Sequence, residues 1–203
     1  MSNTNKIEVI FDVETKKFFD EIEGNNPQKL GVSIVSLYVR SIDENLEETK
    51  GEMKSFWEKD FSKMWKIFQS ADRIIGFNSI KFDVPALEVY ANFPFSKLPH
   101  FDILEHIKKQ FGKRISLNSI AKDTLKIQKL AQGSQAVYWW EKGDEESLNN
   151  LKKYCEQDVK ITKEIYDFGL KNKYLKFTDK WNTERTINVN FEYLQQNPQA
   201  SLF

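Results

Sequence analysis

The stretch that decides the fold is KIEVIFDVE, residues 6–14. Its Ile, Val and Phe residues are typical of a buried strand, and the strand ends in acidic residues. Asp12 and Glu14 are two positions apart. Because side chains in a strand alternate between its two faces, both carboxylates are expected on the same face.

Two carboxylates side by side at the edge of a core repel each other and lose hydration unless a cation neutralises them. Oxygen ligands of this kind suit Mg²⁺ or Mn²⁺. A solvated strand end with two surface acids explains this pair, taken alone, equally well.

Strands and helices are expected to alternate along the rest of the chain. The pattern predicts strands over 31–40, 51–57, 73–78, 100–104 and 180–191. It predicts helices over 60–70, from residue 83 onward, and over 105–112, 116–124 and 145–172, with Ser116 as a cap. Residues 129–145 are predicted to form a loop and residues 193–203 a flexible tail. This order is typical of an α/β layered domain.

Composition limits the classes of protein to which the chain can belong. Its 203 residues fit one domain with a sizeable core, here placed over residues 1–180, followed by an extension over 181–203. The 40% of hydrophobic residues exclude a disordered chain, and no run approaches the roughly 18 apolar residues of a membrane span. A single cysteine, Cys155, excludes an internal disulfide and a zinc site built from cysteines, and it favours a cytoplasmic location.

The charge balance bears on nucleic-acid binding. Thirty Lys and Arg residues balance thirty Asp and Glu residues, so the net charge is zero. Zero net charge argues against a protein that coats nucleic acid by charge alone. It leaves open an enzyme that holds a strand end in a local basic groove.

Two further acids lie on predicted helices, one at a helix start and one within the long helix. Asp83 follows a predicted strand and precedes Val84 and Pro85, a setting that favours an N-cap of the next helix. Asp158 lies four residues after Tyr154 on the predicted long helix, so both project from one face. Because Asp158 borders an apolar stripe, it needs a metal, a partner or a hydrogen bond. A surface Asp paired with a nearby Lys is the alternative.

Three motifs occur in a recognisable order: FDVET at 11–15, GFNSIKFDVP at 76–85 and YCEQD at 154–158. Together they resemble the motifs of the DEDD (DnaQ-like) superfamily of proofreading-type 3′–5′ exonucleases. The tyrosine four residues before the last aspartate is similar to the DEDDy branch, since the sister branch has histidine five residues before it and position 153 is lysine. The resemblance spans residues 7–168 and implies a ribonuclease-H-like α/β fold, a mixed central sheet flanked by helices.

The resemblance also implies a site and a mechanism. Its catalytic residues would be Asp12, Glu14, Asp83, Tyr154 and Asp158, and the four carboxylates would bind two Mg²⁺ or Mn²⁺ ions. By this analogy Asp12 bridges both ions, Glu14 and Asp158 hold the ion on the nucleophile side, and Asp83 supports the second ion. Two ions can stabilise the attacking and the departing oxygen of an in-line displacement. With an ordinary pKa near 10, Tyr154 would orient the attacking water rather than act as a base.

Candidate substrate contacts are Asn78, Thr15 and Trp139. Asn78 lies in the GFN turn, where stabilising the turn is an equally good role. An indole next to a glycine-bearing loop can stack on bases. We expect Trp140 to anchor the loop to the core and leave the role of Trp139 open.

The last five residues, QASLF, resemble the short peptide by which bacterial replication and repair proteins bind the sliding clamp. The matching residues are Gln199, Ser201, Leu202 and Phe203. A mobile tail would offer two apolar anchors to a groove and a glutamine for orientation. An ordinary disordered terminus is the alternative. The clamp hypothesis favours DNA as substrate and a role in replication or repair.

The leading hypothesis is therefore a DNA-directed 3′–5′ exonuclease that acts on single strands and releases nucleoside 5′-monophosphates. An exoribonuclease is the alternative within enzymes, and a structure-specific endonuclease is a further one. A catalytically silent adaptor for the clamp or for nucleic acid represents a different class. The 2′-hydroxyl group separates the DNA hypothesis from the RNA hypothesis.

Overall fold

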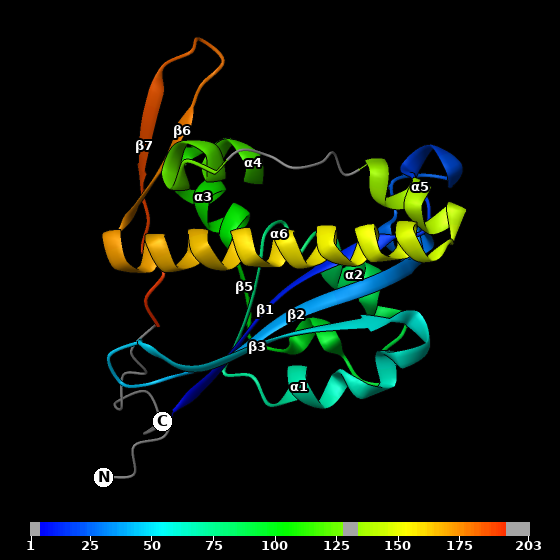
Figure 1. Cartoon of the computed structure of the whole chain (residues 1–203). Coiled ribbons are helices and arrows are strands. Elements are labelled where there is room, and N and C mark those ends of the chain that lie inside the picture. Colours follow the sequence, from blue (N-terminus) through cyan, green and yellow to red (C-terminus); the bar gives the residue numbers. More distant parts are fainter. Residues whose placement is uncertain (1–4, 128–133, 194–203) are drawn as a thin grey trace, which may run out of the picture.

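The computed structural model describes residues 5–127 and 134–193. At its centre lies a five-stranded sheet with the strand order β3-β2-β1-β4-β5. The strands are β1 (Lys6–Thr15), β2 (Val32–Ile42), β3 (Glu48–Trp57), β4 (Arg73–Gly76) and β5 (His100–Asp102). β1, β2 and β3 pair antiparallel, whereas β4 and β5 continue the sheet in parallel to β1. This mixed sheet, flanked by helices, confirms the predicted fold class (Figure 1).

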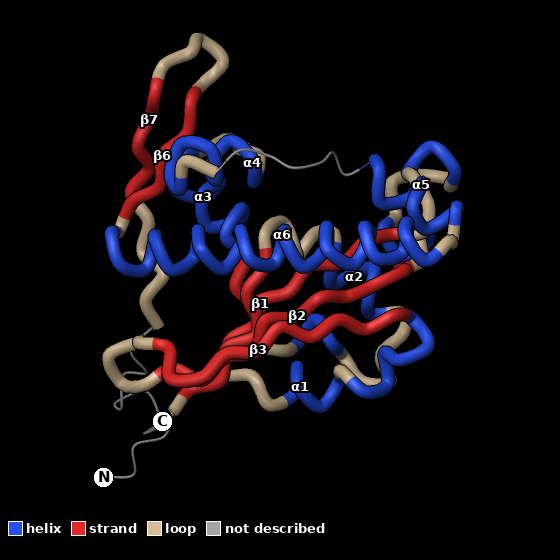
Figure 2. The backbone as a smooth tube through the Cα atoms, viewed as in Figure 1, coloured by secondary structure: helices blue, strands red, loops and turns tan. Residues whose placement is uncertain are grey.

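Helices cover both faces of the sheet (Figure 2). The long helix α6 (Glu145–Asn172) crosses one face. The helices α1 (Trp65–Gln69) and α2 (Asp83–Glu88) contribute to the core on the other. The remaining helices are α3 (Ile103–Phe111), α4 (Leu117–Ile120) and α5 (Ser134–Lys142). A hairpin of β6 (Tyr174–Thr178) and β7 (Glu184–Asn188) follows α6.

The alternation of β1 determines where its acids point. On the face of α1 and α2, β1 contributes Val9, Phe11 and Val13 to the core. On the opposite face, Ile10 packs in the cluster that includes Val159 of α6. Asp12 and Glu14 continue the side of Ile10, because side chains two residues apart share a face. The predicted pairing of the two carboxylates on one face therefore follows from the register of the strand.

Helix α6 matches its predicted limits. Asp144 caps its start by accepting a hydrogen bond from the Ser147 N–H at 2.8 Å. Its buried stripe includes Leu151, Cys155 and Val159. No helix in residues 5–127 or 134–193 has the apolar run that a membrane crossing requires, since even α6 alternates charged with apolar positions.

The predicted loop over 129–145 is wrong for residues 134–142, which form α5. Ala136 and Val137 are buried on one side of this helix. Trp140 stacks on Trp57 of β3, with ring centroids 6.3 Å apart. Gly143, with a left-handed φ of 66°, follows the helix as a terminating glycine does. The small polar residues of this segment favour a loop, but the packing of Ala136, Val137 and Trp140 stabilises the helix instead.

Several other limits differ from the prediction. Residues 60–70 divide into a 3₁₀ turn over Glu58–Lys63 and the short α1. The segment 116–124 begins as α4, capped by Ser116 as expected, and continues as a π-helical turn over Ala121–Leu125. Other 3₁₀ turns span Phe19–Glu21, Pro27–Lys29 and Phe95–Lys97.

Near the C-terminus, the single strand predicted over 180–191 is a hairpin. Its first strand, β6, follows α6 almost directly, so the sequence offered no turn signal before it. The boundary proposed between residues 180 and 181 falls in the turn of this hairpin.

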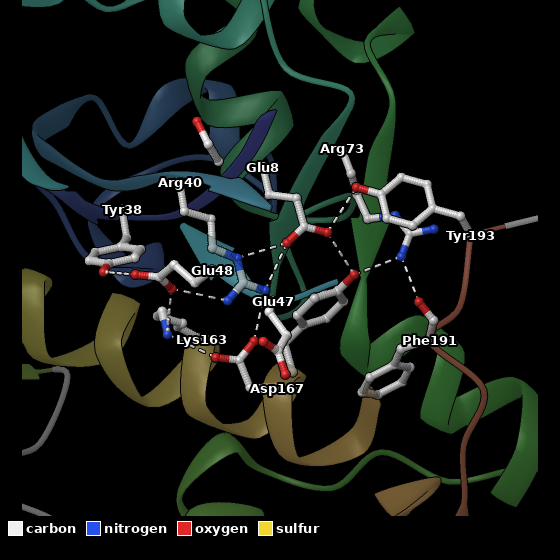
Figure 3. Close-up of polar contacts among 12 residues, drawn as sticks. Glu8, Tyr38, Arg40, Glu47, Glu48, Arg73, Lys163, Asp167, Phe191 and Tyr193 are labelled. Carbon is white, nitrogen blue, oxygen red and sulfur yellow. Dashed lines mark hydrogen bonds and ion pairs between the residues drawn. The ribbon is translucent and has the colours of Figure 1, made fainter. Parts of the chain in front are cut away.

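A buried polar network ties the last described residues to the sheet (Figure 3). Glu8 of β1 is fully buried and pairs with Arg40 of β2 at 2.7 Å. Glu8 also accepts hydrogen bonds from the hydroxyl groups of Tyr166 at 3.0 Å and Tyr193 at 2.8 Å. Arg73 of β4 donates to Tyr166 at 2.7 Å and to backbone carbonyl groups of residues 191 and 192. Buried charges that are paired in this way avoid the large cost of an isolated one.

Candidate active site

The site forms where β1 extends beyond β4. Of the residues of β1, only Glu8, Val9 and Ile10 pair with β4, so the last part of β1 has no paired strand on that side. The N–H of Val13 instead donates to a carboxylate oxygen of Asp83 at 3.3 Å. Asp83 is the first residue of α2, and Phe82 occupies the cap position without a side-chain hydrogen bond. The expectation that Asp83 caps this helix is therefore wrong, and its carboxylate turns toward β1.

Helix α6 brings the other predicted residues to the same place. Cys155 lies against Asp12, with its Sγ 3.6 Å from the backbone oxygen and 4.0 Å from a carboxylate oxygen. One turn along, Asp158 is close enough for its charge to act on Asp12 and Glu14. The predicted site residues of β1, α2 and α6 therefore converge.

The carboxylates strongly perturb one another. Burial raises the pKa of Asp12 well above its ordinary value, and the charge of Asp83 raises it further. The pKa of Glu14 is also raised well above its ordinary value, first by burial and then by the charge of Asp158. Burial raises the pKa of Asp83 to about 7, although the backbone N–H of Val13 opposes this shift. Without a cation the cluster therefore holds protons near neutral pH.

Tyr154 is held beside these acids in its protonated form. Burial raises the pKa of its hydroxyl group, and the charges of Asp158 and Glu14 raise it further, together with a hydrogen bond to Asp158. Its ring contacts that of Trp139, with centroids 6.0 Å apart. Tyr154 is thus suited to donate a hydrogen bond and unsuited to remove a proton at neutral pH.

A cavity of about 700 Å³ lies along this part of α6. Tyr154 and Asp158 line it, together with Trp139 of α5 and Asn118 of α4. The charged residues of the lining balance, since Lys153 and Lys160 are matched by Glu156 and Asp158, and apolar side chains such as Met53 and Ile161 also contribute. Of the four predicted carboxylates, Asp158 lines this cavity, which is large enough for a nucleotide-sized ligand.

Asn78 lies in a turn that Asp102 holds in place. Asn78 has a φ of 65°, and its N–H donates to a carboxylate oxygen of Asp102 at 2.9 Å. Asp102 also accepts from the N–H groups of Ile80 and Glu105, at 3.1 Å each. The side-chain oxygen of Asn78 accepts a hydrogen bond from Arg114 at 3.2 Å. The turn-stabilising role of Asn78 is therefore present, and its substrate contact stays a prediction.

The sequence did not identify Arg114 as a neighbour of the site, because 36 residues separate it from Asn78. The sequence also gave Cys155 no place in the site. This thiol stays protonated, since burial and the charge of Asp12 raise its pKa well above the ordinary value. Its position three residues before Asp158 was the available signal for a place beside the carboxylates.

The other predicted contacts have different outcomes. Thr15 is buried and its hydroxyl group donates to the backbone oxygen of Lys17 at 3.0 Å. Trp140 packs on β3 as expected, and Lys16 lies over its ring at 5.3 Å. The predicted clamp-binding residues lie outside the described residues: Gln199, Ser201, Leu202 and Phe203.

The donor set fits a hard divalent cation. Ligand atoms of Asp12, Glu14 and Cys155 lie within 4.8 Å of one another. The two carboxylates suit Mg²⁺ or Mn²⁺, whereas a protonated thiol is a poor ligand for either ion. Burial is the first cause of the raised pKa values and the neighbouring negative charges are the second, and a bound cation would compensate these charges.

Comparison with known proteins identifies the family and supports the fold. The family described as the RNase_H superfamily matches residues 9–168. Among solved structures, the chain is similar to the family B DNA polymerase from the hyperthermophilic archaeon Pyrobaculum calidifontis, with a TM-score of 0.59 and 18% identity. That match covers 81% of this chain and 24% of the polymerase chain, so the chain spans about a quarter of that protein. No curated protein matches the sequence.

The family match extends from the middle of β1 to α6 and includes every predicted catalytic residue. The structural similarity supports the same fold. The chain belongs to the RNase_H superfamily.

Proposed function

We propose that the protein is a metal-dependent 3′–5′ exonuclease of the DEDDy type, acting on single-stranded DNA. One observation carries the proposal: carboxylates of β1, α2 and α6 converge beside a protonated tyrosine. A cluster of like charges is unfavourable for stability, so its presence points to a role in binding cations. The residues that would hold two Mg²⁺ or Mn²⁺ ions are Asp12, Glu14, Asp83 and Asp158.

The proposed reaction is hydrolysis of the terminal phosphodiester. A water oxygen attacks phosphorus, the bond from phosphorus to the 3′ oxygen breaks, and that oxygen takes up a proton. The products are a nucleoside 5′-monophosphate and a strand one nucleotide shorter. The bound ions would supply stabilisation of the charge on the attacking and leaving oxygens.

The protein groups would orient the reactants. Tyr154, kept protonated by its surroundings, would donate a hydrogen bond to the attacking water. The cavity lined by Trp139, Tyr154 and Asp158 would receive the terminal nucleotide. Lys153 and Lys160 in its lining would contact phosphate groups.

A gel assay tests the proposal. Purified protein is incubated with 5′-labelled single-stranded DNA and RNA of matched sequence, with Mg²⁺, Mn²⁺ or chelator. The expected result is a ladder that shortens from the 3′ end only with metal and that Asp12→Ala abolishes. Asp60→Ala, on the 3₁₀ turn before α1, is the matched control and should leave the ladder unchanged.

The other outcomes identify the alternatives. Shortening of RNA alone would indicate an exoribonuclease, and discrete internal fragments would indicate an endonuclease. Absence of any cleavage by folded protein would contradict the proposal and favour the adaptor.

The sequence QASLF adds a partner to this proposal. A sliding clamp of the bacterial type would bind Gln199, Ser201, Leu202 and Phe203. Tethering would raise the local concentration of the enzyme at DNA without any new contact in the active site. DNA rather than RNA is the substrate that this partner favours.

A further inference from the structure

A second groove lies between the β6–β7 hairpin and the loop that joins α3 to α4. It has a volume of about 470 Å³. Its lining includes four basic residues, Lys113, Arg114, Lys180 and Arg185, and one acid, Asp179. The whole chain has no net charge, so this lining is a local excess of positive charge. We name it the hairpin groove.

The walls of the hairpin groove are fixed to the core. The Thr124 hydroxyl group donates to the backbone oxygen of Lys176 at 2.9 Å and accepts from its N–H at 2.8 Å. The rings of Phe111 and Phe177 contact each other across the groove, with centroids 5.1 Å apart. Leu175 of β6 is fully buried in the core beneath α6. The hairpin therefore forms a firm wall, standing beside α3 and α4 at the far end of α6 (Figure 1).

The tip of the hairpin presents an aromatic ring to solvent. Trp181 is 67% exposed, which is unusual for the largest apolar side chain. Asp179 holds the turn by accepting hydrogen bonds from the N–H groups of Trp181 and Thr183, at 2.9 and 3.0 Å. Lys180 lies over the indole ring at 4.5 Å. A fixed turn thus offers an aromatic face and a cation side by side.

Arg114 connects the hairpin groove to the candidate active site. It lines the groove and also a smaller hollow, whose other charged residues are Lys81, Lys108, Asp102 and Glu105. Through its hydrogen bond to Asn78, Arg114 reaches the turn that leads into Asp83. Lys81, Lys108 and Arg114 thus place basic side chains between the end of β4 and the hairpin, whereas Asp102 in the same hollow is occupied in holding the turn after β4.

We infer that the hairpin groove binds the body of a single-stranded nucleic acid, upstream of the 3′ end held at the carboxylates. Lys113, Arg114 and Lys180 would contact phosphate groups, and Trp181 would stack on a base. Proteins that bind single strands without sequence preference combine these two features. Because this inference rests on the proposed function, its test includes a measurement that needs no catalysis.

The test compares a long and a short oligonucleotide. Binding of labelled 16-nucleotide and 4-nucleotide single strands is measured by fluorescence anisotropy in chelator, where no cleavage occurs. Trp181→Ala should weaken binding of the long strand about fivefold to a hundredfold, the range for loss of one stacked base. The short strand should bind as it does to the wild type, and Trp181→Phe should restore most of the affinity.

The lysines are tested through salt dependence. Lys113→Gln together with Lys180→Gln should lower the slope of log affinity against log salt by about 1.4, since each phosphate contact on a single strand contributes about 0.7. Lys59→Gln together with Lys63→Gln, exposed lysines next to α1, form the matched control and should leave the slope unchanged.

The outcomes separate this inference from the proposed function. If the Trp181 and lysine variants keep the wild-type affinity and still shorten strands, the inference that the hairpin groove binds nucleic acid is wrong and the proposed function stands. An equal loss for long and short strands also overturns this inference, because it would place the contact at the 3′ end. The opposite result is binding that depends on strand length in a wild-type protein that shows no nuclease activity. It would contradict the proposed function and support strand binding in the hairpin groove.

Discussion

At the scale of single residues, the surroundings of Tyr154 limit what its hydroxyl group can do. Burial and three neighbouring carboxylates favour its neutral form. We predict that Tyr154→Phe lowers kcat about tenfold to a hundredfold, the cost of a misplaced reactant. The pH profile should keep its shape, because the lost group does not ionise in the working range. Steady-state kinetics from pH 6 to 9 measure both quantities.

Tyr174→Phe, in β6, is the matched control and should have wild-type kcat. Wild-type turnover in Tyr154→Phe would remove the tyrosine from the mechanism. A change in the shape of the pH profile would instead assign it a proton-transfer role.

The raised pKa values of the carboxylates lead to a second prediction, on how stability and Mg²⁺ affinity change with pH. The folded-state pKa of Asp83 is about 7, against about 3.9 for an unfolded Asp. Between these values the folded protein binds more protons than the unfolded one, so the free energy of unfolding falls as pH rises from about 4 to 7. Because a cation competes with these protons, Mg²⁺ affinity should increase with pH through this window.

Thermal unfolding from pH 5 to 8, with and without Mg²⁺, measures both trends. The metal-free protein should lose Tm as pH rises, and Mg²⁺ should restore it most at pH 8. Asp83→Asn should make the Tm of the metal-free protein depend less steeply on pH, while Asp12 and Glu14 still contribute to that dependence. A metal-free Tm that rises across this range would contradict the raised pKa values.

The residues of the site were predictable to different degrees. Spacing predicts that Asp12 and Glu14 share one face and that Tyr154 and Asp158 share another, because strand and helix periods fix which side chains lie together. That the two pairs belong to one site was implied by the family resemblance. The link between Asp102 and Asn78 joins side chains and backbone 24 residues apart, and no local pattern encodes it.

At the scale of elements, β1 and β2 are joined by a buried ion pair. Arg40 contacts Glu8 and Asp167, both at 2.7 Å, and its side chain is almost fully buried. We predict that Arg40→Met lowers the free energy of unfolding by about 3–5 kcal/mol, because it leaves Glu8 buried without a cation. Urea unfolding followed by circular dichroism measures the change.

Adding Glu8→Gln to Arg40→Met should recover part of the loss, since the uncompensated charge is then removed. Lys63→Met breaks an exposed ion pair with Asp60 and should change stability little. If Arg40→Met and Lys63→Met had the same effect, the buried pair would not have the assigned role.

Elements with a strong periodic pattern were predicted well, and those that depend on packing were not. The limits of α6 follow from its cap and its apolar stripe. In contrast, α5 is short, and its helical form depends on burying Ala136 and Val137 and on the contact of Trp140 with β3. Residues distant in sequence supply these contacts, so local propensity gave the wrong result.

At the scale of the whole molecule, the composition concealed a charge asymmetry. Equal numbers of acids and bases gave no indication of a binding surface. Folding places carboxylates together at the end of β1 and basic residues together beside the hairpin. Such a separation depends on tertiary structure, so composition alone could not reveal it.

The clamp peptide gives a prediction for the intact protein. Removing residues 199–203 should abolish binding to a bacterial-type sliding clamp, because both apolar anchors are lost. Strand shortening without clamp should be unchanged, since the catalytic residues lie elsewhere in the sequence. Surface plasmon resonance on immobilised clamp, alongside the gel assay, measures the two effects. The same clamp affinity before and after the deletion would refute this partner.

Gly169 has a consequence for how far the folding unit extends. Within a helix, Gly is less favourable than Ala by about 1 kcal/mol. A Cβ atom at this position of α6 would overlap the ring of Phe191, which stacks on Tyr166 with centroids 5.6 Å apart. A residue of low helix propensity at this position thus leaves room for Phe191, in the segment that follows β7, to pack against α6. A chain cut before this segment would retain every carboxylate of the proposed site, yet it would expose the surface of α6 that Phe191 covers and would uncover Arg73. The smallest unit that folds on its own is therefore expected to extend at least to residue 193, well past Asp158, the last residue of the proposed site.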